Sequence, residues 1–383
     1  MIQIAIMGLG TVGTGVAKVV EANAAQISRK LGESLAVKTV LVRHFREGAY
    51  RHLMTDDFEK IASDPEIRVV VETIGGVEAA YEYTKRALMA GKHVVTANKQ
   101  LVAEKGCELL ALAKAKNVNY LFEASVGGGI PILHPLTQCM AANRIDEVYG
   151  ILNGTTNYIL TRMIRTGAGF ADALKEAQEK GYAEADPTAD VEGLDARRKL
   201  VLSANLAFGV SVREEDIPCV GISSITAQDI AQAGKKELIF KLIARAERHG
   251  GKVAAFVCPT LFPASAPEAH TGGTGNIVTF CAKRFGTQSF SGAGAGGYPT
   301  GSSVLADCLD IADGCKSFYV DRFAPCRIDL SGCDACWLYR ANGEYFTCKC
   351  SAAHAFERYE QFRKEDSHAL LARIAGDAAE ELC

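Results

Sequence analysis

Residues 2–13, IQIAIMGLGTVG, predict the fold of the first part of the chain. The apolar run over residues 2–7 is typical of a buried strand, and a helix is expected over residues 14–28. Strand, G-x-G-x-x-G and helix in this order favour dinucleotide binding, because the glycines permit a tight turn and the helix start offers free N–H groups to a pyrophosphate. A glycine-rich turn without a ligand is the alternative. The residues expected to contact the dinucleotide here are Gly8, Gly10, Thr11, Val12 and Gly13.

Further strands are predicted over residues 36–42, 68–72 and 93–97, with a helix over residues 77–90. Strands that alternate with helices indicate a parallel α/β sheet, which binds ligands in the loops at the carboxyl ends of its strands. Ile74 and Lys99 follow two of these strands and are therefore expected to border the cofactor.

The second predicted strand ends at Arg43, where a fold that selects NAD usually carries an acidic residue for the ribose 2′-hydroxyl. Arg43 favours a 2′-phosphate instead, and hence NADP, with NAD as the alternative if this arginine is only solvated. The residue after Arg43 is His44, so no acidic residue is present there to bind the ribose 2′-hydroxyl.

The most polar part of the chain is residues 181–199, GYAEADPTADVEGLDARRK, with five acidic and three basic residues. From Val191 onward the apolar residues recur at helical spacing, and Asp190 is a candidate N-cap for a helix over residues 191–208. Asp195 and Lys199 lie four residues apart, so both side chains project from one face of that helix. By themselves they indicate only an i,i+4 ion pair on a surface helix.

This stretch resembles the substrate signature of homoserine dehydrogenases, G-Y-x-E-x-D-P-x-x-D-x-x-G-x-D-x-x-x-K, at every fixed position. The similarity extends over residues 2–313. It implies a Rossmann-type NAD(P)-binding domain over residues 1–145, an α+β substrate domain over 146–290 and a return to the nucleotide domain over 291–315. The implied reaction is the reversible, NAD(P)H-dependent reduction of L-aspartate 4-semialdehyde to L-homoserine, in threonine, methionine and isoleucine biosynthesis.

The resemblance also implies roles for individual residues. Lys199 is expected to donate a proton to the substrate oxygen, and Lys99 to lie near the nicotinamide and share in that transfer. The residues expected to bind the substrate are Glu184, Asp190 and Asp195, and those that complete the cofactor site are Gly181, Gly294 and Gly296.

The glycine-rich segment over residues 119–133 is matched in the family to a monovalent cation site. The implied oxygen ligands for Na⁺ or K⁺ come from Glu123, Val126, Gly128 and Ile130, and oxygen ligands suit a hard cation. A purely structural turn is the equal alternative on the residues alone.

Composition excludes several classes of protein. The formal net charge is −3 and the basic residues are spread out, so no nucleic-acid partner is indicated. No apolar run is long enough to span a bilayer and no signal-peptide pattern is present, so no membrane partner is expected. The thirteen cysteines are scattered, which suits reduced thiols. We expect a cytoplasmic enzyme with a small-molecule substrate, and the family implies a homodimer or homotetramer.

The resemblance ends before residues 316–383, which lack the length and pattern of an ACT module. We predict a small cysteine-rich appendage here, whose aromatic side chains pack on the nucleotide domain or on a second subunit. Cysteines in an apolar appendage are usually unligated, but a Zn²⁺ site is an alternative, as is a regulatory or partner-binding module. The zinc set would be Cys333, Cys336, Cys348 and Cys350.

A catalytically silent relative that binds nucleotide as a sensor is the alternative function. Such a protein would be expected to lose the charged residues at the chemistry. All of those residues are present: Lys99, Glu184, Asp190, Asp195 and Lys199.

Overall fold

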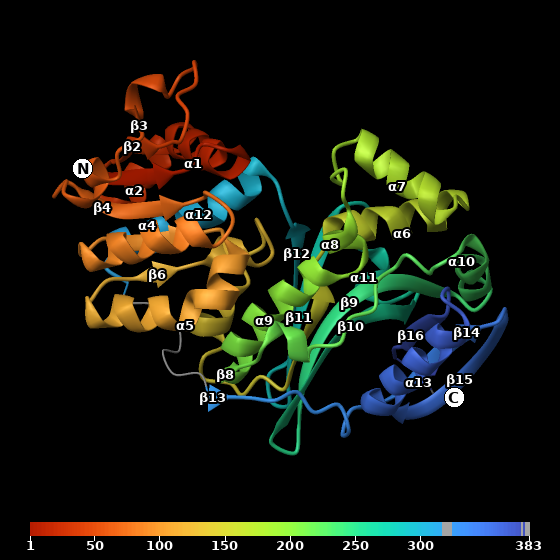
Figure 1. Ribbon diagram of the computed structural model, residues 1–383. Helices are drawn as coiled ribbons and strands as arrows, with labels where there is room; N and C mark the ends of the chain where they lie inside the picture. The colour runs from red at the N-terminus through yellow and green to blue at the C-terminus, as the bar shows by residue number, and fades with distance from the viewer. Residues whose placement is uncertain (316–323, 377, 380–383) are drawn as a thin grey trace. The chain divides into compact units, whose positions relative to one another are not determined.

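The computed structural model describes residues 1–315, 324–376 and 378–379. The chain forms two compact units, each built from two segments (Figure 1). The first unit takes in Met1–Ala141 and Ala293–Phe323, and the second takes in Ala142–Gly292 and Ala324–Cys383. Among the helices of the described residues, none combines the length and the apolar character needed to cross a membrane.

The first unit contains a six-stranded sheet with the order β3-β2-β1-β4-β5-β6, in which every neighbouring pair is parallel. This is the strand order of the doubly wound dinucleotide-binding fold, so the predicted Rossmann-type architecture is confirmed. The order reverses between β1 and β4, and ligands bind beside such a reversal. The strands are β1 Ile2–Met7, β2 Leu35–Leu41, β3 Met54–Thr55, β4 Ile67–Glu72, β5 His93–Thr96 and β6 Tyr120–Leu121.

The helix predicted over residues 14–28 is two helices, because Asn23 interrupts it. The Asn23 side chain donates a hydrogen bond to the Val19 carbonyl at 3.0 Å, and its backbone leaves helical angles. Asparagine competes in this way for backbone partners. The longer helices of the first unit are α1 Thr11–Ala22, α2 Ala24–Leu31, α4 Glu78–Met89, α5 Lys99–Ala115 and α12 Gly297–Ala312, with short turns at η1 Arg51–Leu53, α3 Glu59–Ala62, η2 Glu123–Ser125 and η3 Pro135–Cys139.

Helix α12, which comes from the second chain segment of this unit, packs directly on α1. A Cβ built on Gly15 would lie 2.0 Å from the Gly297 carbonyl oxygen, and one on Gly301 would lie 2.8 Å from the Gly15 carbonyl carbon. Glycine is required at this crossing because no side chain fits between the two backbones. The start of α12 is thereby held beside Thr11, at the start of α1.

The second unit contains an eight-stranded mixed sheet with the order β12-β11-β7-β9-β10-β16-β14-β15. Its central hairpin pairs β9 with β10 along twelve residues of each strand. A two-stranded sheet pairs β8 with β13. The strands are β7 Glu147–Ile151, β8 Val210–Ser211, β9 Leu238–His249, β10 Lys252–Pro263, β11 Gly275–Ala282, β12 Gly286–Ala293, β13 Ala324–Pro325, β14 Asp334–Ala341, β15 Glu344–Ser351 and β16 Leu370–Ile374.

The C-terminal segment is not a separate appendage. Strand β16 pairs with β10 and β14, so β14, β15 and β16 extend the sheet of the second unit. Trp337 and Phe256 pack with Phe356 of α13, with ring centroids 5.7–6.0 Å apart. The prediction that these aromatic residues pack on the nucleotide domain or on another subunit is therefore wrong for the described ones. The remaining predicted aromatic residues, Phe318, Tyr319 and Phe323, lie outside the described residues.

Helices cover both faces of this sheet. Phe256 contacts α13, but the next residue, Val257, lies against Gly193 at the start of α9. Successive residues of a strand point to opposite faces, so the C-terminal segment covers the second face.

The helix predicted over residues 191–208 is also broken, and Asp190 is not its N-cap. Gly193 has a left-handed φ of 79° and ends one helix and begins the next; a Cβ here would lie 2.9 Å from the Cys219 sulfur. Asp190 instead lies inside the short helix α8, which leaves its carboxylate free for other partners. The helices of the second unit are α6 Gly154–Thr166, α7 Phe170–Glu179, α8 Thr188–Val191, α9 Leu194–Phe208, α10 Ala227–Gly234, α11 Pro267–His270 and α13 Ala352–Glu365, with a short turn at η4 Glu214–Asp216.

We predict that Phe256→Ala lowers the free energy of unfolding of the second unit by ~3–5 kcal/mol, because it leaves a cavity between β10 and α13. Trp337 is the only tryptophan and is fully buried against Phe256, so its fluorescence during urea denaturation measures the change. The control is Glu357→Ala, at an exposed position of α13 next to Phe356, with an expected change within ~0.5 kcal/mol. Equal effects of the two substitutions would contradict this account of the core.

Candidate nucleotide and substrate sites

A cavity of about 690 Å³ lies in the first unit, around the loops that follow β1, β2 and β4. Of the predicted cofactor residues, it is lined by Gly8, Gly10, Arg43 and Ile74. A second cavity of about 290 Å³ is lined by Val12 and Lys99, with Gly75 and Gly76. Gly75 lines both cavities, so they are neighbours along the edge where this fold binds dinucleotides.

The glycine turn is shaped for backbone contact with a ligand. Gly8 has a φ of 96°, and a Cβ on Gly13 would lie 2.0 Å from the Gly8 carbonyl oxygen. Thr73 on the neighbouring loop donates its hydroxyl to the carbonyls of Met7 and Gly8, at 3.1 and 2.9 Å. Thr11 is the first residue of α1, so its N–H points out of the helix start. These features fit a pyrophosphate at the N-terminus of α1.

Arg43 is joined in its cavity by His44, Arg46 and an acidic residue, Asp56. Sequence analysis did not identify Asp56, because it follows the short strand β3 and not β2, where the acid is usually sought. The rim of the cavity therefore offers cations for a phosphate and one carboxylate for a hydroxyl group.

Glu72 is a second residue that the sequence analysis did not identify. Its buried carboxylate accepts hydrogen bonds from the Thr96 hydroxyl at 2.5 Å and from the Ile74 N–H at 2.7 Å. Burial raises the pKa of Glu72, while these hydrogen bonds lower it. Since Thr96 ends β5 and Ile74 follows β4, Glu72 holds together the two loops that line the cavities.

Lys99 begins α5, directly after its N-cap Asn98. The Asn98 side chain accepts from the Leu101 N–H at 3.0 Å and donates to the Gly76 carbonyl at 2.6 Å. These bonds fix the helix start against the loop after β4 and so set the position of Lys99.

In the second unit, Lys199 and Asp195 form a buried ion pair with a separation of 2.8 Å. Lys199 also donates to the Leu152 carbonyl at 2.6 Å. Two charges removed from water need hydrogen bonds to their remaining donors and acceptors, and the loop between β7 and α6 supplies them. The residues alone indicated an ion pair on a surface helix. The pair is present, but it is buried.

Asn153 joins the predicted acids into one cluster. Its amide donates to Asp190 at 2.7 Å and to Asp195 at 2.9 Å, while its oxygen caps α6 by accepting from the Thr156 N–H at 2.8 Å. Burial, assisted by the Asp195 carboxylate, raises the pKa of Asp190, whereas Asn153 lowers it. Nothing local in the sequence links Asn153 to these acids, because they are more than thirty residues away along the chain.

The start of α6 faces a buried amide. Asn276 is 1% exposed, and neither its Nδ2 nor its Oδ1 has a hydrogen-bond partner among the described residues. A Cβ built on Gly154 would lie 3.6 Å from the Asn276 oxygen. The start of α6 and the buried Asn276 amide therefore lie together, beside the Asn153 cluster.

Glu184 and Gly181 lie on the turn after α7, and both are exposed. The Glu184 backbone carbonyl accepts from Gln178 at 3.0 Å, and Gly181 has a left-handed φ of 72°. The hydrogen bonds observed for the Asn153 cluster do not include the Glu184 side chain.

The remaining predicted residues lie in the first unit. A Cβ on Gly128 would lie 2.3 Å from the Gly294 carbonyl oxygen, and Gly296 is the N-cap of α12 with a φ of 123°. Neither Gly294 nor Gly296 lines the two cavities described above. Val126 and Ile130, two residues before and two residues after Gly128, are both buried.

The Glu123 carboxylate accepts hydrogen bonds from three consecutive N–H groups, those of Ile132, Leu133 and His134, at 2.5, 2.9 and 2.5 Å. Its backbone N–H donates to Asp307 at 2.9 Å. Burial raises the pKa of both carboxyl groups.

The four cysteines of the predicted zinc set do not converge. Cys336 pairs across the hairpin with Lys349, the residue between Cys348 and Cys350. Paired residues share a face and strand neighbours alternate, so Cys336 points away from Cys348 and Cys350. This arrangement contradicts the Zn²⁺ site that the sequence left as an alternative.

Comparison with known proteins finds relatives over most of the chain. Family profiles described as homoserine dehydrogenase and as its NAD-binding domain match residues 131–309 and 8–123. The homoserine dehydrogenase of Bacillus subtilis is 42% identical over 314 residues, which cover 81% of this chain and 72% of the relative.

Solved structures extend the similarity. A homoserine dehydrogenase from Thiobacillus denitrificans has a TM-score of 0.89 at 33% identity, and covers 98% of both chains. A hyperthermophilic archaeal homoserine dehydrogenase in complex with NADPH has a TM-score of 0.68 at 26% identity, and covers 81% of this chain and 97% of its own. The first match includes most of the C-terminal segment, where the resemblance in sequence ends.

We predict opposite behaviour for two substitutions in the glycine turn. Gly13→Ala places a methyl group against the Gly8 carbonyl, so we expect the ligand-free protein to lose ~1–3 kcal/mol of stability. Gly10→Ala meets no protein atom within 4 Å but projects beside the cavity, so stability should be unchanged while the Kd for NADPH rises tenfold or more. Thermal denaturation and NADPH titration measure the two effects. Unchanged NADPH affinity in Gly10→Ala would place the cofactor elsewhere.

Proposed function

The chain belongs to the homoserine dehydrogenase family, and on this premise we propose how its residues divide the work of the reaction. The chain is an NAD(P)-dependent oxidoreductase that acts on a CH–OH group and interconverts L-aspartate 4-semialdehyde and L-homoserine. Nothing in the comparisons supports the alternative of a silent sensor. The observation that carries the assignment of roles is the buried Lys199–Asp195 pair and its link to Asp190 through Asn153.

The bound nicotinamide supplies a hydride to the aldehyde carbon, and the glycine turn and Arg43 hold the rest of the cofactor. We assign the cofactor as NADP, because Arg43 and Arg46 line the cavity beyond β2 and offer cations for a 2′-phosphate. The carboxylate of Asp56 in the same cavity is suited to a ribose hydroxyl, which leaves NAD as a weaker ligand. The NADPH complex of the archaeal relative is in line with this preference.

Lys199 is the proton donor. Hydride addition turns the aldehyde oxygen into an alkoxide, which takes a proton from the Lys199 ammonium as it forms. Asp195 holds the ammonium group at 2.8 Å, so it orients the proton donor. Lys99, at the start of α5 beside the second cavity, assists near the nicotinamide.

The substrate carries an ammonium and a carboxylate group, and the second unit offers a partner for each. Asp190, Asp195 and the exposed Glu184 supply negative charge for the ammonium group. The first turn of α6 supplies backbone N–H donors for the carboxylate. Gly181 gives the Glu184 turn its left-handed backbone, and its contact with the cofactor stays a prediction.

A monovalent cation, Na⁺ or K⁺, is proposed at Glu123 with the carbonyls of Val126, Gly128 and Ile130. Its support is a buried carboxylate whose three N–H donors leave about one of its four lone-pair positions open. Gly294 and Gly296 would act indirectly, by packing the cation loop against the start of α12.

We also propose that the chain forms a homodimer or homotetramer. Strand β12 is the edge of its sheet and nearly all of its residues are exposed. An exposed edge strand leaves backbone groups available for pairing with another chain.

We expect Lys199→Ala to lower kcat by ~10²–10⁴-fold, the usual contribution of a general acid, with the Kd for NADPH nearly unchanged. Lys199→Arg is the matched control, because arginine keeps a positive charge beside Asp195 but cannot release a proton at neutral pH. If Lys199 only neutralises Asp195, arginine will restore most of the activity. If Lys199 transfers the proton, both variants will be slow. Steady-state kinetics with L-homoserine and NADP separate these outcomes.

For Arg43→Ala we expect the KM for NADPH to rise far more than that for NADH, by ~1.5–3 kcal/mol of lost charge-assisted contact. Lys18→Ala is a suitable control, since Lys18 is an exposed cation of α1 that does not line either cavity. The assignment of Arg43 fails if the two cofactors are affected equally, or if the wild-type enzyme prefers NADH.

A further inference from the structure

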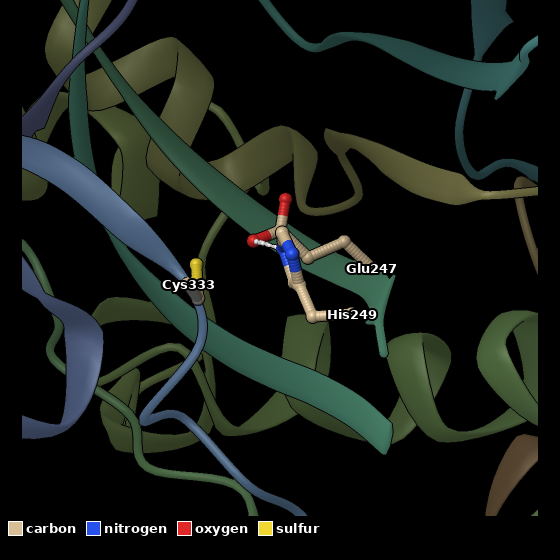
Figure 2. Close-up of side chains that lie close together, drawn as sticks. All are labelled: Glu247, His249 and Cys333. Carbon is tan, nitrogen blue, oxygen red and sulfur yellow. Dashed lines mark hydrogen bonds and ion pairs between the residues drawn. The ribbon is translucent and has the colours of Figure 1, made fainter. Parts of the chain in front are cut away.

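Three side chains of different chemistry meet at one end of the eight-stranded sheet. Glu247 and His249 lie two residues apart on β9, and Cys333 comes from the segment just before β14. One carboxylate oxygen, one imidazole nitrogen and the sulfur all lie within 4.8 Å of one another. Figure 2 shows Glu247 and His249 hydrogen-bonded to each other, with the Cys333 sulfur brought in from a separate segment.

The elements that carry these side chains are held by regular pairing. Glu247 pairs with Ala254 of β10 and with Glu147 of β7, so its backbone is bonded on both sides. The Cys333 N–H donates to the Leu330 carbonyl at 3.4 Å, and its carbonyl accepts from the Ala352 N–H at 2.8 Å. The three side chains therefore start from backbone positions that are fixed before any ligand arrives.

The cysteine segment passes close to β9 at Gly332. A Cβ built at this position would lie 3.4 Å from the Cβ of His249, which is ordinary contact at the tight end of the range. The segment thus runs directly along the histidine, and Cys333 follows it into the interior with 1% exposure.

Charged side chains surround the cluster. Arg245, two residues before Glu247 on β9, places its guanidinium 3.7 Å from the other Glu247 oxygen and pairs with Glu147. Burial and the Glu247 carboxylate raise the pKa of Cys333, while Arg373 and Arg245 oppose that effect.

We propose that Glu247, His249 and Cys333 form a binding site for a single Zn²⁺ ion, with water as the fourth ligand. A sulfur, an imidazole nitrogen and a carboxylate oxygen are the donors that Zn²⁺ takes in proteins. Ligand atoms around tetrahedral Zn²⁺ lie about 3.5 Å apart, so rotations of the side chains suffice to close the cluster. The His249 side chain is 42% exposed and that of Glu247 14%, which gives the ion a path from solvent.

Such an ion would join the end of β9 to the segment that leads into β14, and would thereby fasten the C-terminal part of the sheet. This site shares Cys333 with the zinc set predicted from sequence, but none of its other ligands. It is independent of the proposed catalytic roles, because all of its residues lie outside the Asn153 cluster and the two cavities.

The test uses Co²⁺ as a spectroscopic substitute for Zn²⁺ on the full-length, reduced and chelator-treated protein. We expect about one Co²⁺ per chain, a thiolate-to-cobalt charge-transfer band, and loss of that band when Zn²⁺ is added, because Zn²⁺ generally binds such sites more tightly than Co²⁺. Cys333→Ser should abolish the band, and His249→Ala should weaken Co²⁺ binding tenfold or more.

Two control variants test whether the band depends on Cys333 and His249 and not on other cysteines and histidines. Cys350→Ser removes a cysteine of the original zinc set, and His354→Ala removes an exposed histidine of α13; both should leave the band intact. Circular dichroism verifies that each variant is folded. The proposal is overturned if folded wild-type protein gives no charge-transfer band, if Cys333→Ser retains it, or if Cys350→Ser loses it.

Discussion

The Lys199–Asp195 ion pair is the interaction on which the second unit depends most. Both side chains are nearly removed from water, which costs several kcal/mol per ion unless partners replace the lost hydration. Those partners come from the loop between β7 and α6, where the Leu152 carbonyl and the Asn153 amide reach α9. The loop, the break at Gly193 and the start of α9 must therefore be in register with one another, and the same requirement gathers the polar groups that chemistry needs.

Close backbone approach plays the corresponding part in the first unit. Gly13 lets α1 lie against the turn at Gly8, and Gly15 lets α12 lie against α1, so each helix start is brought to the edge of the parallel sheet. Glu72 then ties the loops after β4 and β5 together. Each unit thus combines a rigid sheet with one buried polar arrangement that sets its loops, and loops positioned by a rigid scaffold commonly carry function.

Features encoded by local spacing could be predicted from the sequence, and features made by distant pairing could not. The glycine turn, the parallel sheet and the shared helix face of Asp195 and Lys199 all follow from neighbouring residues. Asn153 and Asn276 have partners that only the fold brings near. The C-terminal strands join the sheet because β16 pairs with β10 about a hundred residues earlier, and this pairing leaves no local signal. The faces of Cys336 and Cys348 depend on hairpin register in the same way.

The central claim is that this chain reduces an aldehyde by hydride transfer from a bound nicotinamide while a buried lysine supplies the proton. The most direct measurement follows NADPH absorbance in purified protein on addition of L-aspartate 4-semialdehyde, with L-homoserine quantified at the end. The account predicts continuous oxidation of NADPH with one L-homoserine formed per NADPH consumed. Saturable NADPH binding without turnover, in folded protein supplied with Na⁺ or K⁺, would contradict it.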